Sequence, residues 1–263
     1  MADQEAEEGE SPVRQGFPLS TDLADVELSR RIQVACAWCG PAFVVLLFGG
    51  WGFMGGFIPL IPPSDTAAQV AAAYGNHANL HRLGLVFGMI GVALTIPFFL
   101  VISLQMRRAE RRFPVLASLQ MASGIIVTVV LMVPMLLFVG GAFRPDRSPE
   151  LTQLVNDLSY VMLILPWPPI IGQLVPIAVC AFTDRRTEPV FPRWLGYYNL
   201  WMAFALLPAT LIIFFKTGVF AWTGLIGFWI PAAAFGIWYL VMTVMVLRAV
   251  RSEAVEERQL VVA

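Results

Sequence analysis

Six long runs of apolar residues constrain the fold of this chain more than any other feature. None of the runs has a charged residue in its interior, and each reaches the roughly 20 residues that a helix needs to cross a bilayer. Because backbone groups in hydrocarbon must pair within their own segment, such runs predict helices and not open strands. The predicted spans are about 34–60, 83–106, 115–143, 158–183, 194–215 and 224–247.

The composition supports the same fold class. The chain of 263 residues is 58% hydrophobic and only 13% charged, which is too little charge to cover the surface of a soluble domain of this length. We therefore predict an all-α, polytopic transmembrane helix bundle with six spans. Only the segment Lys216-Thr217-Gly218 separates the last two spans, and the alternative is a merger or a different split between Phe215 and Trp229.

Basic residues predict the orientation of the bundle. Six spans place both termini on one side of the membrane. Of the 17 basic residues, only Arg82, Arg144, Arg147 and Lys216 fall in loops on the opposite side. Since cytoplasmic loops carry an excess of Arg and Lys, we expect both termini to be cytoplasmic.

Three segments near the two ends of the chain flank the region of the six predicted spans. Residues 1–19 are acidic and broken by proline and glycine, and we expect a disordered tail. Residues 20–33 combine N-cap side chains with apolar residues on one helix face, which predicts an amphipathic interfacial helix. Residues 248–263 predict a charged cytoplasmic tail that extends the last helix.

Glycines indicate how the first two spans pack. Gly84, Gly88 and Gly91 share one face of the second span, and five glycines between residues 49 and 56 crowd the first. Small residues at this spacing let helix backbones approach closely in lipid. We expect the two spans to form a tight hairpin.

The sequence PWPP at residues 166–169 is the best indication of a ligand pocket. Its three prolines remove three backbone donors within the fourth span, and such a break must be buried in protein or line a cavity. The alternative is a structural kink that is packed dry. A neutral polar residue of the same span and one of the next span complete the candidate ligand-binding set: Pro166, Trp167, Pro169, Gln173 and Asn199.

The chain has two histidines, His77 and His81, spaced to lie on one face of a helix. They could hold a metal if a carboxylate joined them from the loop around residues 144–160, and Asp157 is the candidate third ligand. The alternative is a polar collar, with Asn76, Asn79 and Arg82, that sets the depth of the second span. A role in pH sensing is a further alternative. We expect no other cofactor.

Several classes of chemistry find no support in the sequence. No Asp, Glu, Lys or Arg lies inside a span, which disfavours a proton-coupled transporter. Cys36 and Cys39 flank Ala-Trp, but the second cysteine precedes Gly-Pro, so the spacing departs from a thioredoxin-type site. No catalytic triad, phosphate loop or nucleic-acid-binding pattern is present in the sequence.

The segments FRPDRSPELTQLVNDLSY, PVFPRWLGYYNLW and FFKTGVFAWTGLIGFW resemble a group of uncharacterised bacterial, chiefly actinobacterial, six-helix integral membrane proteins. The resemblance covers most of the chain after about Ile58. It implies a multi-pass protein of the bacterial cytoplasmic (inner) membrane and adds no chemistry.

Three functional hypotheses follow. The first is a non-catalytic membrane protein that binds lipid, a hydrophobic small molecule or a partner membrane subunit. The second is a small uncoupled carrier of an uncharged or amphipathic solute. The third is an outer-face metal-binding subunit or metal enzyme. Expected partners are membrane lipids and a partner membrane protein or a second copy of the chain, with no nucleic acid.

Overall fold

A computed structural model describes residues 23–110, 114–144 and 146–262, and it describes the side chains only as far as residue 259. The predicted disordered tail, residues 1–19, lies outside the described residues. Within the described ranges all regular structure is helical, as predicted. The elements are α1 (Leu23–Val44), η1 (Val45–Met54), α2 (Ala67–Gly75), α3 (Ala78–Ala93), α4 (Thr95–Ala109), α5 (Val115–Phe143), α6 (Pro149–Ile164), α7 (Trp167–Thr183), α8 (Arg193–Leu206), η2 (Leu207–Ile213), η3 (Leu225–Trp229) and α9 (Ile230–Val262).

Six helical segments of the described chain are long and apolar enough to cross a membrane, which confirms the predicted fold class. Most of these segments consist of two consecutive helical elements. α1 continues into η1, α3 into α4, α6 into α7, α8 into η2, and η3 into α9. The last two spans are separate, because the chain between η2 and η3 is non-helical. The segments are Leu23–Met54, Ala78–Ala109, Val115–Phe143, Pro149–Thr183, Arg193–Ile213 and Leu225–Gln259.

The first span has different ends from those predicted. Residues 23–33, predicted as a separate interfacial helix, are continuous with the span that follows them. The helix then ends at Met54 and not at residue 60. Gly55 closes the last turn by donating its N–H to the Gly50 carbonyl at 2.7 Å, and Gly56 adopts a φ of +68°, which leaves the helical region.

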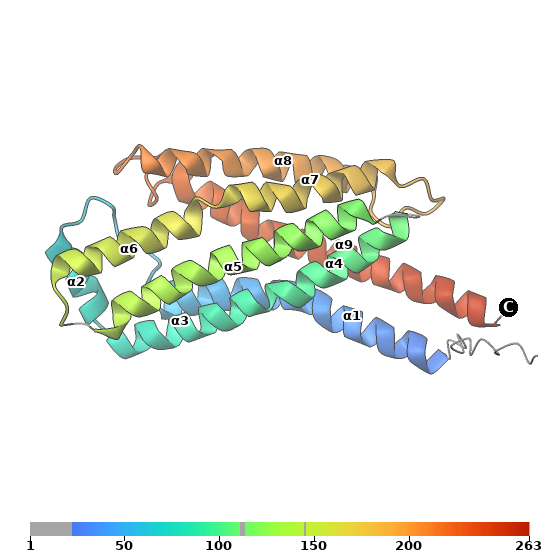
Figure 1. Ribbon diagram of the computed structural model, residues 1–263, viewed down its shortest axis with the longest axis horizontal. Helices are drawn as coiled ribbons and strands as arrows, with labels where there is room; N and C mark the ends of the chain where they lie inside the picture. The colour runs from blue at the N-terminus through green and yellow to red at the C-terminus, as the bar shows by residue number, and fades with distance from the viewer. Residues whose placement is uncertain (1–22, 111–113, 145, 263) are drawn as a thin grey trace, which may run out of the picture.

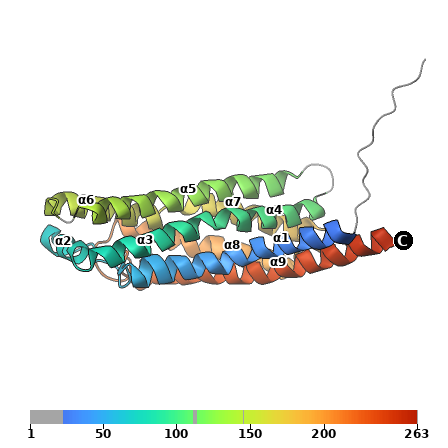
Figure 2. The same ribbon diagram turned by 90° about the horizontal axis from the view of Figure 1, so that it is seen from below.

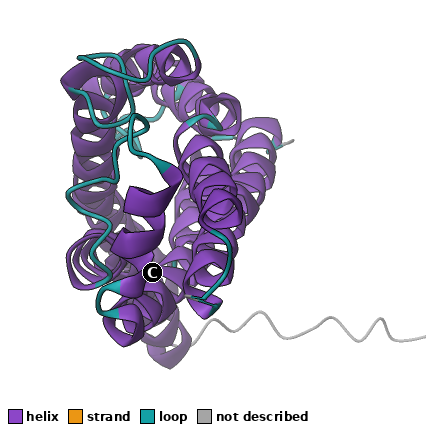
Figure 3. Cartoon of the chain, turned by 90° about the vertical axis from the view of Figure 1, so that its left-hand side faces the viewer, coloured by secondary structure: helices purple, strands orange, loops and turns teal. Residues whose placement is uncertain are grey.

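Both ends of the described chain lie at the same end of the bundle, which we call the terminal end (Figures 1 and 2). There α1 and α9 lie side by side, and Arg258 forms an ion pair with Glu27 at 2.9 Å. The opposite end carries α2 and is called the α2 end. Figure 3 views the bundle from the α2 end. The helices are seen nearly end-on, and loops cross the near end of the bundle.

The predicted glycine packing is confirmed for the first two spans. η1 and α3 lie against each other, and a Cβ atom added to Gly84 would be 2.4 Å from the Gly55 Cα and 2.5 Å from the Gly50 carbonyl oxygen. One turn along, a Cβ at Gly88 would lie 3.0 Å from the Trp51 Cβ. The two backbones therefore touch, as small residues allow in lipid.

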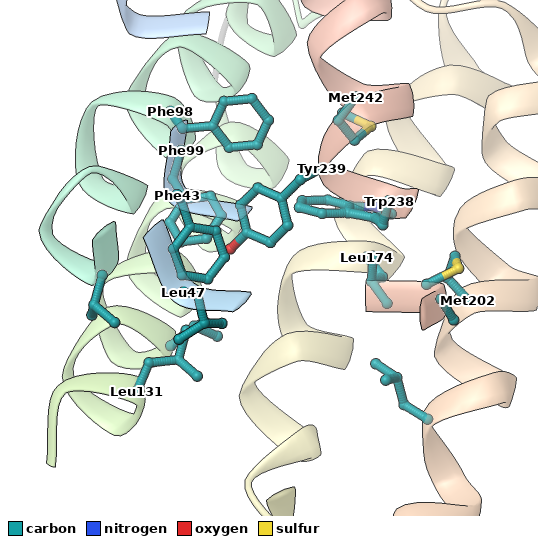
Figure 4. Packing of buried hydrophobic residues seen from close by; sticks show 14 of the residues in the cluster. Phe43, Leu47, Phe98, Phe99, Leu131, Leu174, Met202, Trp238, Tyr239 and Met242 are labelled. Atoms are coloured by element: carbon teal, nitrogen blue, oxygen red, sulfur yellow. The ribbon is translucent and has the colours of Figure 1, made fainter. Parts of the chain in front are cut away.

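A buried aromatic cluster joins α1, α4 and α9 at the centre of the bundle (Figure 4). Tyr239 is its middle member, with its ring centroid 4.6 Å from that of Phe43 and 5.2 Å from that of Phe98. Phe99 and Trp238 pack beside it. Such ring pairs contribute about 0.5–1.5 kcal/mol beyond the burial of their area, so this cluster holds three spans together.

The start of α5 is capped by a residue from the preceding span. The Glu110 carboxylate accepts hydrogen bonds from the backbone N–H groups of Leu116 and Ala117, both at 2.8 Å. These N–H groups belong to the first helical turn, which has no intrahelical acceptor for them. The negative charge also lies at the positive end of the helix dipole. Glu110 thus stabilises the turn between α4 and α5.

Candidate functional site

An apolar cavity lies inside the bundle and is called the core cavity. Its volume is about 90 Å³, and its wall comes from η1, α5, the α6–α7 junction, the α8–η2 junction and the η3–α9 junction. Two of its residues, Leu47 and Leu131, lie beside the central aromatic cluster in Figure 4. The wall residues are Leu47, Phe48, Trp51, Leu131, Leu163, Ile164, Trp167, Ile170, Leu206, Ala209, Phe228, Pro231, Ala232 and Phe235.

The proline-rich break forms one side of the core cavity. α6 ends at Ile164 and α7 begins at Trp167, with Pro166 in the N-cap position. Pro168 and Pro169 then fall in the first turn of α7, where N–H groups have no intrahelical partner and proline is tolerated. Trp167 lines the cavity, and its Nε1 donates to the Thr210 hydroxyl at 2.8 Å. That hydrogen bond connects the α6–α7 junction to η2.

The structure places the five predicted ligand-binding residues in different surroundings. Trp167 is part of the cavity wall. Pro166 and Pro169 belong to the break and are half-buried, but they do not line the cavity. Gln173 and Asn199 are buried elsewhere in the bundle. The sequence pattern therefore indicated the break beside the cavity and only one residue of its wall.

Gln173 lies in the interface between α5 and α7. It is 1% exposed, and its Nε2 would lie 2.5 Å from a Cβ added to Gly124. This nitrogen has no hydrogen-bond partner among the described residues, and the same is true of both amide atoms of Gln120 on α5. Leaving a buried polar group unpaired costs about 1–3 kcal/mol. The α5–α7 interface is thus a second place where a polar ligand atom or a water molecule would be stabilised.

Both polar atoms of the Asn199 side chain have hydrogen-bond partners in the protein. Its Oδ1 accepts from Trp238 Nε1 at 2.9 Å, and its Nδ2 donates to the Leu195 carbonyl at 2.8 Å. The side chain is completely buried. Asn199 therefore joins α8 to α9 and has a structural role in this conformation.

Aromatic side chains form a layer next to the core cavity, on the side of the α2 end. This aromatic layer consists of Trp51, Phe57, Phe138, Tyr160 and Trp222, whose neighbouring ring centroids are 4.6–5.9 Å apart. On α5, Phe138 lies about two helical turns nearer the α2 end than the wall residue Leu131. Trp51 belongs both to this layer and to the cavity wall.

Hydrogen bonds hold the aromatic layer to the loop after η1. Trp222 Nε1 donates to the Ile61 carbonyl at 2.8 Å, and the Ile61 N–H donates to the Tyr160 hydroxyl at 3.3 Å. Trp51 differs from these residues. It is 1% exposed and lines the cavity, and its Nε1 has no hydrogen-bond acceptor in the part of the chain that the structure describes. The Trp51 indole can therefore donate to a ligand acceptor.

The histidines lie at the α2 end and point to different surroundings. His77 is exposed and precedes α3 with a φ of +59°. His81 is half-buried, with its Nδ1 against the Gly55 carbonyl oxygen and its Nε2 3.0 Å from the Ala73 carbonyl oxygen. Both nitrogens of His81 thus face backbone acceptors, and this imidazole connects the loop after η1 to the end of α2.

The structure does not bring the proposed metal ligands together. Asp157 lies on α6, where its carboxylate accepts from the Asn156 amide at 3.3 Å. Among residues 23–110, 114–144 and 146–262, no group of three or more His, Cys, Asp or Glu side chains could hold a metal ion. The collar residue Arg82 instead donates to the Ala142 and Phe143 carbonyls at 3.1 and 3.2 Å, which ties α3 to the end of α5.

Most of the cavity wall was missed by sequence reasoning. Its residues from η1, η3 and α9 are apolar residues within apolar spans, so no local pattern distinguishes them from residues that face lipid. Pro231 offered the clearest signal, because it stands near the start of the last span where η3 changes into α9. Trp51 offered another, as an aromatic donor within a glycine-rich segment.

The fold and the apolar cavity define a class of protein, the multi-pass α-helical membrane proteins. Comparisons of the chain with protein-family models, with curated proteins and with solved structures find no match.

Proposed function

We propose that this membrane protein binds an apolar molecule from the bilayer and holds a segment of it in the core cavity. The observation that carries the proposal is the cavity itself, whose wall is made of aliphatic and aromatic side chains within the membrane-length helices. Its volume of about 90 Å³ is smaller than the roughly 150 Å³ of an apolar cavity known to hold benzene. It suits a slender group, such as part of an acyl chain.

The position of the aromatic layer supports entry from the lipid side. The layer lies toward the α2 end, whereas several wall residues are only half-buried and so reach the outside of the bundle. Half-buried wall residues include Phe48, Ile164, Trp167 and Phe235. Between these side chains a lipid tail would pass without crossing water.

The unpaired Trp51 Nε1 supports a ligand with an acceptor atom beside its apolar part. A donor that is buried without a partner is stabilised by about 0.5–1.5 kcal/mol when it gains a neutral acceptor. An ester or ketone oxygen would satisfy it, and a plain alkane would not. The proposed ligand is therefore a lipid or lipid-like molecule and not a pure hydrocarbon.

Two neighbouring alanines provide a matched test. Ala232 lines the core cavity, and Ala233 is exposed on the outside of α9. We expect Ala232→Phe to fill the cavity and remove lipid that co-purifies in mild detergent, as measured by mass spectrometry. Ala233→Phe adds the same side chain outside the cavity and should retain the lipid. Equal retention in both variants, or no retained lipid in the unchanged protein, would contradict the proposal.

A second candidate is an uncoupled carrier of an uncharged or amphipathic solute. The buried Gln120 amide and the Gln173 Nε2, which have no partner among the described residues, favour it, because they offer hydrogen bonds to a solute inside the bundle. Flux into proteoliposomes, compared with the Gln173→Leu variant, tests this function. Flux that is absent from the unchanged protein, or equal in both, would refute it.

We further propose that the terminal end faces the cytoplasm of a bacterial cell. The charge distribution supports this, since the predicted topology assigns 13 of the 17 basic residues to the side of the termini. A reporter fused to the C-terminus that is active only in the cytoplasm tests the orientation. A partner subunit or second copy, if bound, would co-purify in the same mild detergent preparation.

A further inference from the structure

A cleft at the terminal end lies outside the core cavity. Charged and polar side chains line it, whereas the core cavity is apolar. The cleft has a volume of about 540 Å³, within the roughly 300–1,000 Å³ of small-molecule sites. We call it the basic cleft. It lies where α4 and α7 both end, beside the loop that leads to α8. Its lining residues are Arg108, Ala109, Thr183, Asp184, Arg185 and Arg186.

The loop backbone engages Asp184, whose carboxylate lines the basic cleft. The two oxygens of Asp184 accept from the N–H groups of Arg186 at 3.0 Å and Val190 at 2.8 Å. These bonds fold the segment between α7 and α8 over the carboxylate. Asp184 therefore shapes the loop that presents the arginines, and both of its oxygens already have donors.

Two of the arginines are held in place by carboxylates on α9. Glu256 on α9 lies 3.1 Å from an Nη of Arg108 and 2.7 Å from an Nη of Arg186. Arg108 also donates to the Gln105 side chain at 2.7 Å and to the Ala249 carbonyl at 3.0 Å. The Nε of Arg108 also lies 3.7 Å from the Glu253 carboxylate on α9, so Glu253 and Glu256 together hold the two arginines in place.

Arg185 adds a third guanidinium to the lining of the basic cleft. It is exposed, and it forms no ion pair with any side chain that the structure describes. The three arginines line one space; Arg108 and Arg186 are paired with Glu253 and Glu256, and Arg185 is the one without an ion-pair partner among the described residues. Guanidinium groups match the geometry of phosphate oxygens and bind them with paired hydrogen bonds.

We propose that the basic cleft binds a phosphate group, and specifically the headgroup phosphate of an anionic phospholipid. The cleft lies at the ends of two membrane-length helices, at the depth where lipid headgroups meet water. Basic pockets between membrane helices are typical sites for anionic headgroups. The cleft and the core cavity share no lining residue, so this site stands independently of the proposed function.

Arg185→Gln tests the site, because Arg185 makes no described ion pair whose loss would disturb the fold. The matched control is Arg193→Gln, which removes the same charge from an exposed position at the start of α8, outside the cleft. Full-length protein in detergent is titrated with phosphatidylglycerol and, separately, with phosphatidylcholine, and the bound lipid is counted by native mass spectrometry.

We expect the unchanged protein to prefer phosphatidylglycerol and Arg185→Gln to weaken that binding about fivefold, the effect of one basic residue near an anionic lipid. Arg193→Gln should bind as the unchanged protein does. Equal weakening in both variants would overturn the proposal, since it would reflect general surface charge. Inorganic phosphate that displaces phosphatidylglycerol at equal concentration would overturn the lipid assignment, because a lipid site gains affinity from the attached tails.

Discussion

Replacing Gly84 by alanine tests the closest contact in the bundle. The added Cβ would lie 2.4 Å from both the Cα and the N of Gly55 and 2.5 Å from the Gly50 carbonyl oxygen. Carbon atoms pack at about 3.5–4.0 Å, so α3 and η1 must separate by about 1 Å. All three contacted atoms are backbone atoms, and no side chain can rotate away.

The expected magnitude follows from two opposing effects. Overpacking of a well-packed interior costs about 1–3 kcal/mol, and a clash with backbone atoms belongs at the upper end of that range. Replacing a helical glycine returns about 0.5–1 kcal/mol, because the unfolded chain loses conformational freedom. We expect Gly84→Ala to lower the free energy of unfolding by about 2 kcal/mol, measured by denaturant titration in mixed micelles.

Gly140→Ala is the matched control for this experiment. Gly140 lies within α5, and a Cβ added there would meet no atom within 4 Å. The control should be as stable as the unchanged protein or slightly more stable. If Gly84→Ala and Gly140→Ala unfold with the same free energy, the close approach of η1 and α3 is not a determinant of stability and the packing argument is wrong.

Three further substitutions test other contacts. His81→Leu should lower the free energy of unfolding by about 1–3 kcal/mol, because it leaves two backbone carbonyls without the imidazole, and proteolysis of the loop after η1 should become faster. Trp238→Phe should cost a similar amount by leaving the Asn199 oxygen unpaired, and adding Asn199→Leu should recover part of the loss in a double-mutant cycle. Glu110→Ala should cost about 1 kcal/mol by removing the cap of α5, with protection of its first-turn amides in hydrogen exchange as the measurement.

Local patterns predicted much of the fold because the bilayer imposes a local rule. Every backbone group in hydrocarbon must be paired within its own helix, so an uncharged apolar run of sufficient length predicts a span without knowledge of its neighbours. The break at Pro166 was predictable for the same reason, since proline cannot donate and the ends of α6 and α7 flank it. The tight contact of Gly84 with the first span also followed from spacing alone.

The candidate site was less predictable, because membership in a cavity wall depends on helix rotation. Trp167 and Gln173 belong to the same helix, and only Trp167 lines the core cavity. Asn199 looked like a free polar group in the sequence, but Trp238, distant in sequence, satisfies its oxygen. The two nitrogens of His81 likewise meet carbonyls that no local pattern places beside them.

The sequence by itself determined that this chain is a membrane-length helical bundle with six spans, since length and the absence of charge depend on each segment alone. Tertiary structure decided which apolar residues surround a cavity, which arginines converge on the basic cleft and which polar groups are already satisfied. The physical reason is that lipid-facing and buried faces of a membrane helix are both apolar. Hydrophobicity therefore identifies the spans, and only the contacts between helices distinguish their faces.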